Sequence, residues 1–203
     1  EGLEGYEEYL GPTHLIECDN PEIINLAQQI IGDETDSWSA VKLLLNWTHN
    51  YLEPFQPVGM LSATNILKTM KGNQYEHSIL FASLARALGI PTRISFGERY
   101  DGSTSFFKFH VWNEVWVGEW VAVDPFYNQS APDSLLVKIS DDNCISRLYA
   151  SSNRRKEDFQ IIILELVTLN ETTKTYTHYK THLTDEYIDF KSGFKLKIPA
   201  DKW

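Results

Sequence analysis

The sequence lacks several features that would define a function class on their own. It contains no apolar run long enough to cross a membrane and no signal-peptide pattern at its start. Its 18 basic residues are outnumbered by 28 acidic ones, which gives a net charge of −10. Nucleic acids and anionic membrane surfaces both require a basic footprint. We therefore expect no nucleic-acid partner and no membrane insertion within this chain, and we interpret the acidity as an aid to solubility.

Cysteine is also scarce, since Cys18 and Cys144 are the only two. They could form one disulfide or could both be free and buried, so cysteine usage leaves the compartment open. The abrupt start at Glu1-Gly2 is typical of a mature or trimmed end, which leaves room for a removed signal or anchor. We expect an extracellular or cell-surface location. The histidines show no ligand spacing of a metal site, so we expect neither a metal nor another cofactor.

The hydrophobic pattern divides the chain into helices followed by strands. Apolar residues recur at helical spacing over 21–31, 36–52 and 63–70, and a segment at 75–88 is apolar on nearly all sides. Such a helix is typically buried at the centre of a domain. The period then changes to two, which predicts strands at 92–98, 107–117, 120–123, 135–139, 159–168 and 173–182. Residues 118–119 are predicted to form a two-residue hairpin turn. The order predicts an α+β fold, with N-terminal helices and a buried central helix packed on an antiparallel sheet.

The C-terminal residues suggest a second part of the molecule. We expect one domain over residues 1–182 and an extension over 183–203. Residues 187–203 have the pattern of further strands. They could open another module of a longer protein, or they could form a terminal hairpin that packs back on the first domain.

Three blocks, in a fixed order, carry most of the functional signal. The first runs from Gly72 through Gln74 into an apolar helix that ends in Arg-Ala-Leu-Gly-Ile-Pro at 86–91. The second is His-Val-Trp-Asn-Glu-Val at 110–115, and the third is Trp-Val-Ala-Val-Asp-Pro at 120–125. Together they resemble the core of the transglutaminase-like superfamily, which is related to the papain-like thiol enzymes. The resemblance extends from about residue 12 to 125 and more weakly to about 181.

The resemblance implies a Cys-His-Asp site in which Gln74 occupies the cysteine position, with His110 as base and Asp124 as its orienting partner. A thiol at a helix N-terminus is stabilised as thiolate, and a histidine oriented by a carboxylate handles its proton. A carboxamide has no ionisable proton and is a negligible nucleophile. Active members of the superfamily form thioesters on peptide or glutamine amides and pass the acyl group to an amine or to water.

Other residues are expected to surround this site. Asn73 and Tyr75 flank Gln74, and Trp112 follows His110 by two positions, so all three are expected to line the cleft. Trp112 also fits a position in the core. His110 could instead be a core histidine, and Asp124 could simply form a turn. The family pattern favours catalytic roles for both residues over these structural ones. We expect Arg86 and Arg93 to be structural rather than catalytic, pairing with carboxylates or backbone carbonyls.

Three functions fit these residues. We favour a catalytically inactive member, or pseudoenzyme, that binds peptides or proteins or acts as a scaffold. The second is an active acyltransferase, peptidase or amidase whose natural cysteine has been replaced by Gln74, or a site in which His110 activates water directly. The third is a purely structural domain of a longer cell-surface or secreted protein.

Overall fold

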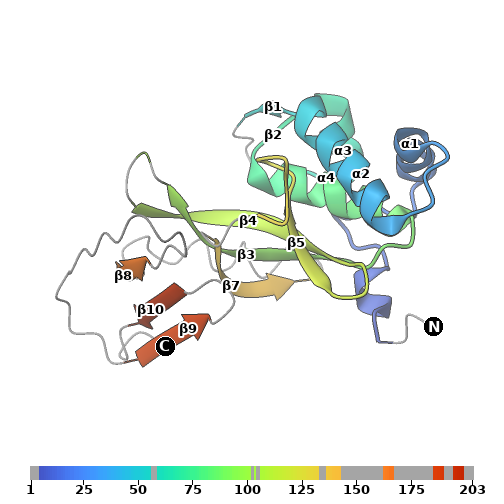
Figure 1. The fold of residues 1–203 in the computed structure, drawn as a ribbon. Helices are drawn as coiled ribbons and strands as arrows, with labels where there is room; N and C mark the ends of the chain where they lie inside the picture. The colour runs from blue at the N-terminus through green and yellow to red at the C-terminus, as the bar shows by residue number, and fades with distance from the viewer. Residues whose placement is uncertain are drawn as a thin grey trace. The chain divides into compact units, whose positions relative to one another are not determined.

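A computed structural model describes residues 5–55, 59–101, 103, 106–132, 136–142, 162–166, 185–189 and 194–198. The chain forms two compact units (Figure 1). The first comprises Glu1–Tyr100 and Lys108–Tyr149, and the second comprises Asp101–Phe107 and Ala150–Trp203. The described part of the first unit holds the helices and a five-stranded sheet, so it carries every residue of the expected site.

The first two long helices begin where the sequence places capping residues. Helix α1 spans Pro21–Ile31, and the Asn20 side chain accepts a hydrogen bond of 2.9 Å from the Glu22 N–H. Helix α2 spans Ser37–Tyr51, and Asp36 accepts a bond of 2.8 Å from the Ser39 N–H. The short helix α3 spans Ala63–Thr69. The helices expected at 21–31, 36–52 and 63–70 are therefore confirmed to within one residue at each end. A short 3-10 turn at Glu7–Tyr9 precedes them.

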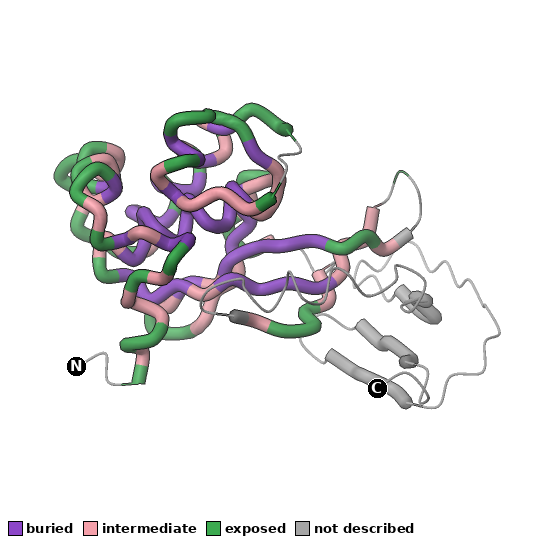
Figure 2. The backbone as a smooth tube through the Cα atoms, turned by 180° about the vertical axis from the view of Figure 1, so that it is seen from behind, coloured by how far each residue is buried: buried purple, intermediate pink, exposed green. Residues whose placement is uncertain are grey.

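Helix α4, Gln74–Ala87, is the central helix of the first unit. Every residue from Glu76 to Arg86 is buried, and α1, α2 and α3 all contact this helix. Figure 2 shows the burial running along α4 and along the long strands of the sheet. The all-round apolar pattern therefore predicted both the helix and its central place, because such a helix has no face that water favours.

The large sheet of the first unit has the strand order β6-β5-β4-β3-β7. Its strands are β3 Thr92–Asp101, β4 Phe106–Trp116, β5 Trp120–Asp124, β6 Gln129–Ser130 and β7 Leu136–Asp142. The pairs β3–β7, β4–β5 and β5–β6 are antiparallel. The predicted α+β fold, with helices packed on an antiparallel sheet, is confirmed.

The turn between β4 and β5 differs from the prediction. Trp116 pairs with Trp120, so the connection contains three residues rather than two. Val117 was expected to continue the strand because it extends the apolar alternation. Instead its N–H donates to the Glu119 carbonyl at 3.1 Å, and Gly118 takes a φ of 99° that favours glycine. The turn still brings β4 and β5 side by side.

A two-stranded parallel sheet was not predicted from the sequence. It pairs β1, Glu53–Pro54, with β2, Lys71–Gly72. The segment around Pro54 was interpreted as a loop, because a two-residue strand leaves no period to detect. This pairing fixes the chain immediately before α4, which is where the candidate site begins.

The described part of the second unit is a three-stranded antiparallel sheet with the order β8-β10-β9. Strand β8 spans Ile162–Leu166, β9 spans Asp185–Asp189 and β10 spans Phe194–Ile198. Strand β10 from the C-terminal extension thus pairs with β8, which the sequence assigned to the domain at 1–182. The strand predicted at 173–182 and Cys144 lie outside the described residues.

Candidate active site

Strands β4 and β5 bring His110 and Asp124 into contact. The His110 Nε2 atom lies 2.7 Å from Asp124 Oδ2, and both side chains are buried. The other carboxylate oxygen accepts the N–H groups of Phe126 and Tyr127 at 3.1 Å each. An ionised carboxylate only accepts hydrogen bonds, so the His110 Nε2 carries the proton in this bond. The Nδ1 atom of a neutral ring is then the proton acceptor.

The start of α4 is held by a reciprocal capping box. The Asn73 side chain accepts from the Tyr75 N–H at 2.8 Å, and Glu76 Oε2 accepts from the Asn73 N–H at 2.9 Å. Gly72 makes room for this arrangement, because a Cβ atom there would lie 2.3 Å from the Glu76 Cβ. Burial raises the pKa of the Glu76 carboxyl above its usual value. The spacing from Gly72 to Glu76 is thus a packing requirement at this helix start.

Gln74 is the first residue of α4 and is partly buried. A side chain at this position lies at the positive end of the helix dipole, where a thiol would be stabilised as thiolate. The Gln74 carboxamide makes no side-chain hydrogen bond with the described residues. The position therefore has the setting of an activated nucleophile, without an ionisable group.

Aromatic contacts bring the first turns of α4 against the strand that carries His110. The His77 and Phe126 rings are 5.1 Å apart, and the Phe126 and His110 rings are 6.3 Å apart. On the other side, the Tyr75 ring stacks on Phe109 at 6.2 Å. Gln74 directly precedes Tyr75 in the first turn of α4, and through Tyr75 this turn contacts Phe109, the residue before His110.

Two histidines beside the site were not selected from the sequence. His77 Nδ1 bonds to the Asn73 carbonyl at 2.8 Å, and burial lowers the pKa of the His77 imidazole. His49 of α2 bonds through Nδ1 to the Phe126 carbonyl at 3.0 Å. His49 thereby ties α2 to the turn that follows Asp124. The contact of His49 joins residues 77 positions apart in sequence, so no local pattern indicated it.

Arg99 and Tyr127 were also missed. Arg99 Nη1 lies 4.0 Å from Asp124 Oδ2, and the guanidinium lies over the Tyr127 ring at 4.2 Å. The Tyr127 ring is in turn 5.3 Å from the His110 ring. The only sequence signal was the aromatic pair directly after Asp124-Pro125. Next to Arg99, burial raises the pKa of the Glu98 carboxyl to about 7.

The three expected wall residues differ in how accessible they are. Trp112 is only 2% exposed and stacks on His110 at 6.3 Å, so it supports the imidazole from within the core. Asn73 and Tyr75 are partly buried and flank Gln74 on the helix. Only these two expected wall residues therefore have surface on which a ligand could bind directly.

Arg86 and Arg93 take the structural roles expected of them. Arg86 donates to the Thr92 carbonyl at 2.9 Å and to the Gly11 carbonyl at 2.7 Å. Arg93 pairs with Glu114 at 2.7 Å and lies over the Trp120 ring at 4.1 Å. Their contacts hold the first unit together around α4 and β3.

Cys18 is unsuited to act as a substitute nucleophile. It is a free, buried cysteine whose Sγ lies 3.5 Å from the Leu10 carbonyl, and burial raises the pKa of its thiol.

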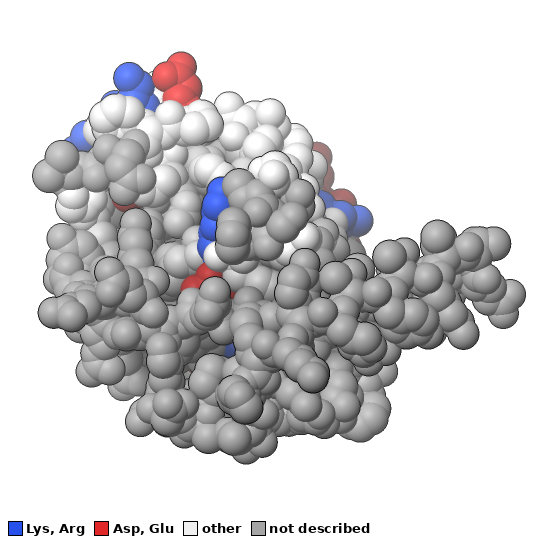
Figure 3. Space-filling view, turned by 90° about the vertical axis from the view of Figure 1, so that its left-hand side faces the viewer, with Lys and Arg blue, Asp and Glu red and all other residues white. Residues whose placement is uncertain are grey.

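Within the described residues, no three His, Cys, Asp or Glu side chains converge to hold a metal ion, and no helix is long and apolar enough to cross a membrane. On the face in Figure 3, the described surface is mainly uncharged, with separate basic and acidic side chains.

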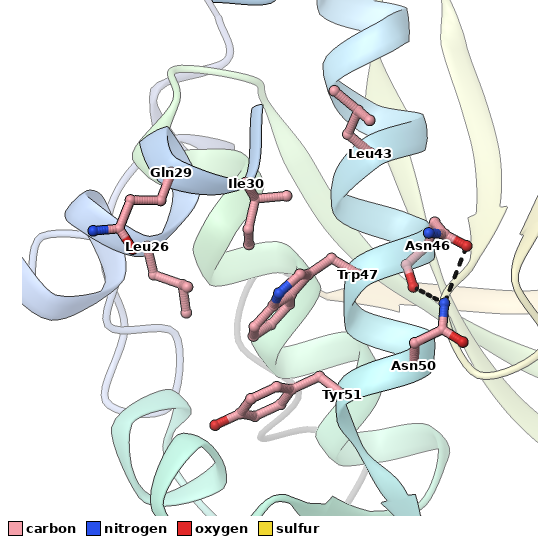
Figure 4. Close-up of a pocket in the computed structure, with 8 residues that line it drawn as sticks. All are labelled: Leu26, Gln29, Ile30, Leu43, Asn46, Trp47, Asn50 and Tyr51. Carbon is pink, nitrogen blue, oxygen red and sulfur yellow. Dashed lines mark hydrogen bonds between the residues drawn. The ribbon is translucent and has the colours of Figure 1, made fainter. Parts of the chain in front are cut away.

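A separate pocket lies between α1 and α2 and has a volume of about 600 Å³. Trp47 and Tyr51 stack at 4.3 Å and point from α2 toward Leu26 and Ile30 of α1 (Figure 4). The lining also includes Asn50, whose side chain bonds to the Asn46 carbonyl. None of the lining residues belongs to the site around Gln74.

Comparison with known proteins identifies the family. The model of the transglutaminase-like superfamily matches residues 24–125, just over half of the 203 residues. This chain therefore belongs to that superfamily, as its three motif blocks predicted. A search of curated proteins found no match.

One solved structure shows the same fold, and a second is similar over part of this chain. A candidate cysteine protease from Cytophaga hutchinsonii matches with a TM-score of 0.63 and 24% identity, over 71% of this chain and 49% of that one. The periplasmic domain of TgpA from Pseudomonas aeruginosa matches with a TM-score of 0.47 and 21% identity, over 61% of this chain and 46% of that one. The chain thus spans about half the length of these structures.

Proposed function

We propose that this transglutaminase-like domain is a pseudoenzyme that binds a peptide or protein segment around Gln74 and His110. The observation that carries the proposal is the carboxamide of Gln74 at the first position of α4, in a unit that keeps an intact His110–Asp124 hydrogen bond. A carboxamide cannot form the thioester on which the family's covalent chemistry depends. The base has therefore lost the group that it would deprotonate, while the packing around it is retained.

Ligand binding is supported by the groups that stay accessible at the site. Gln74 and Tyr75 are partly buried, and Phe109 and Tyr127 are 38% and 48% exposed. Aromatic rings and an amide side chain suit a peptide, because they supply apolar contact area together with hydrogen bonds. Glutamine-containing peptides are the first probe, since glutamine amides are substrates of the family's active members.

Binding is tested by adding glutamine-containing peptides to ¹⁵N-labelled protein and following the Gln74 and His110 side-chain signals. The matched control peptides carry glutamate in place of glutamine. We expect saturable shifts at both side chains without any release of ammonia or transfer to an added amine. Turnover of the peptides by the native chain would overturn the pseudoenzyme proposal, and unchanged signals at saturating peptide would favour a purely structural domain.

The second candidate is an active thiol enzyme whose cysteine has been replaced by Gln74 in this sequence. The buried His110–Asp124 pair favours it, because a site that no longer handles protons has no catalytic need for it. Sequencing the gene from its natural source separates the two candidates. A cysteine codon at position 74 would establish the replacement, and a glutamine codon would exclude it.

A further inference from the structure

Asp124 contacts a second side chain, the Arg99 guanidinium, in addition to the His110 ring that it orients. Its carboxylate is fully buried, and one oxygen already accepts two backbone N–H groups. The other oxygen, Oδ2, lies 2.7 Å from His110 and 4.0 Å from Arg99 Nη1. The guanidinium and the imidazole thus share one carboxylate oxygen.

Arg99 is held at this place by two further contacts. Its guanidinium lies over the Tyr127 ring at 4.2 Å, and its Nη1 donates to Gln129 Oε1 at 3.4 Å. Its side chain is 17% exposed, so water only partly screens its charge.

We propose that Arg99 is a positioning residue that keeps the His110 imidazole neutral, with its proton on Nε2 and its Nδ1 atom free to accept a hydrogen bond. A carboxylate beside a histidine favours the charged imidazolium, whereas a cation that shares the carboxylate opposes that charge. With Arg99 in place, Asp124 can orient the His110 ring without stabilising the doubly protonated imidazolium.

This inference rests on the proposed function in one respect, because it specifies what the site offers to a ligand. A neutral ring accepts a hydrogen bond at Nδ1, so the favoured partner is an N–H donor such as a peptide or glutamine amide. An imidazolium would instead favour a carboxylate. The Arg99 charge thus matches the ligand class suggested by the family.

Several other groups around His110 titrate or carry charge and must be separated from the effect of Arg99. They are Asp124 of β5, Arg99 of β3, Tyr127 in the turn after β5, His77 of α4 and His49 of α2. His77 is itself buried, and burial lowers the pKa of its imidazole, so it adds little positive charge at neutral pH. Arg99 is the permanent cation among these groups.

The test is the protonation of the His110 ring, followed by long-range ¹H–¹⁵N correlation spectra between pH 5 and 9 in the full chain. The spectra show which ring nitrogen carries a proton and need no ligand, so they stay informative even if no peptide binds. In the native chain at pH 7 we expect a neutral ring protonated at Nε2. In Arg99→Gln we expect the equilibrium between charged and neutral ring to move about tenfold toward the charged form, since a neighbouring charge shifts a titration by about one unit or more.

Two further variants make the outcome specific. Arg99→Lys keeps the charge and should restore a ring that is mostly neutral at pH 7. Lys138→Gln removes one positive charge that pairs with Glu114 and Asp141, and it should leave the His110 titration unchanged. The proposal is overturned if Arg99→Gln leaves the titration in place, if Arg99→Lys behaves like Arg99→Gln, or if Lys138→Gln moves the titration equally.

Discussion

Gly72→Ala tests how the start of α4 is built. A Cβ atom at this position would lie 2.3 Å from Glu76 Cβ and 2.9 Å from Glu76 Cγ. These are the inner atoms of a side chain that is 1% exposed, so they cannot swing away as the end of a flexible chain would. Strand β2 and the first turn of α4 must separate instead, which breaks the hydrogen bond from the Asn73 N–H to Glu76.

The expected cost combines two effects. Overpacking a buried contact costs about 1–3 kcal/mol, and the loss of a helix cap costs about 1 kcal/mol. We therefore expect the free energy of unfolding to fall by about 2–4 kcal/mol. Urea denaturation followed by tryptophan fluorescence measures it, because most tryptophans belong to the first unit. These are Trp38, Trp47, Trp112, Trp116 and Trp120.

Two comparisons separate this clash from the general effect of replacing a glycine. Gly11→Ala should change stability by less than about 0.5 kcal/mol, since a Cβ there meets only the Glu7 carbonyl at 3.6 Å. Glu76→Gly removes the clashing atoms, so adding Gly72→Ala to it should cost little more. If Gly72→Ala is as stable as the native chain, or if its cost persists in full beside Glu76→Gly, the packing argument is refuted.

Three further outcomes follow from the site. Asn73→Ala should lower the free energy of unfolding by about 1 kcal/mol through the lost cap, measured in the same urea assay. Glu98→Gln should raise stability at pH 8 by about 1–2 kcal/mol after discounting for solvent screening, and should have no effect at pH 4. The sign follows because burial raises the pKa of Glu98 from 4.5 to about 7, so its carboxyl destabilises the fold increasingly as the pH rises between these two values. The pKa of His77 is lowered by burial, so stability should fall as the pH drops below about 6.5, and His77→Gln should flatten that part of the stability profile. An unchanged pH profile in either variant would contradict its assignment.

The sequence predicted those parts of the fold that rest on strong local patterns. The apolar pattern of 75–88 predicted α4, and the alternation around the β4–β5 turn placed His110 beside Asp124. The turn length was wrong because Val117 continues the apolar alternation while its N–H bonds to Glu119. Hydrophobic period reports which residues are buried, and it does not report where a ladder ends.

The surroundings of the site could not be predicted in the same way. His49 reaches the Phe126 carbonyl across 77 positions of sequence, and Arg99 reaches Asp124 from a different strand. Such contacts depend on how α2, β3 and the turn after β5 pack, which no local spacing records. For Trp112 the sequence left a core position and a cleft wall both open, since an aromatic residue two positions from His110 fits either, and the structure buries it.

The central claim is that covalent chemistry fails at Gln74 alone, while His110 and Asp124 stay ready to act. Its most direct test is the rate at which iodoacetamide alkylates the thiol introduced by Gln74→Cys, followed by mass spectrometry from pH 5 to 9. We predict that this thiol is alkylated rapidly at pH values well below the ordinary cysteine pKa of about 8.5. His110→Ala in the same background should abolish this rapid alkylation at low pH. A thiol that titrates like a free cysteine, or native protein that already turns over glutamine peptides, would contradict the account.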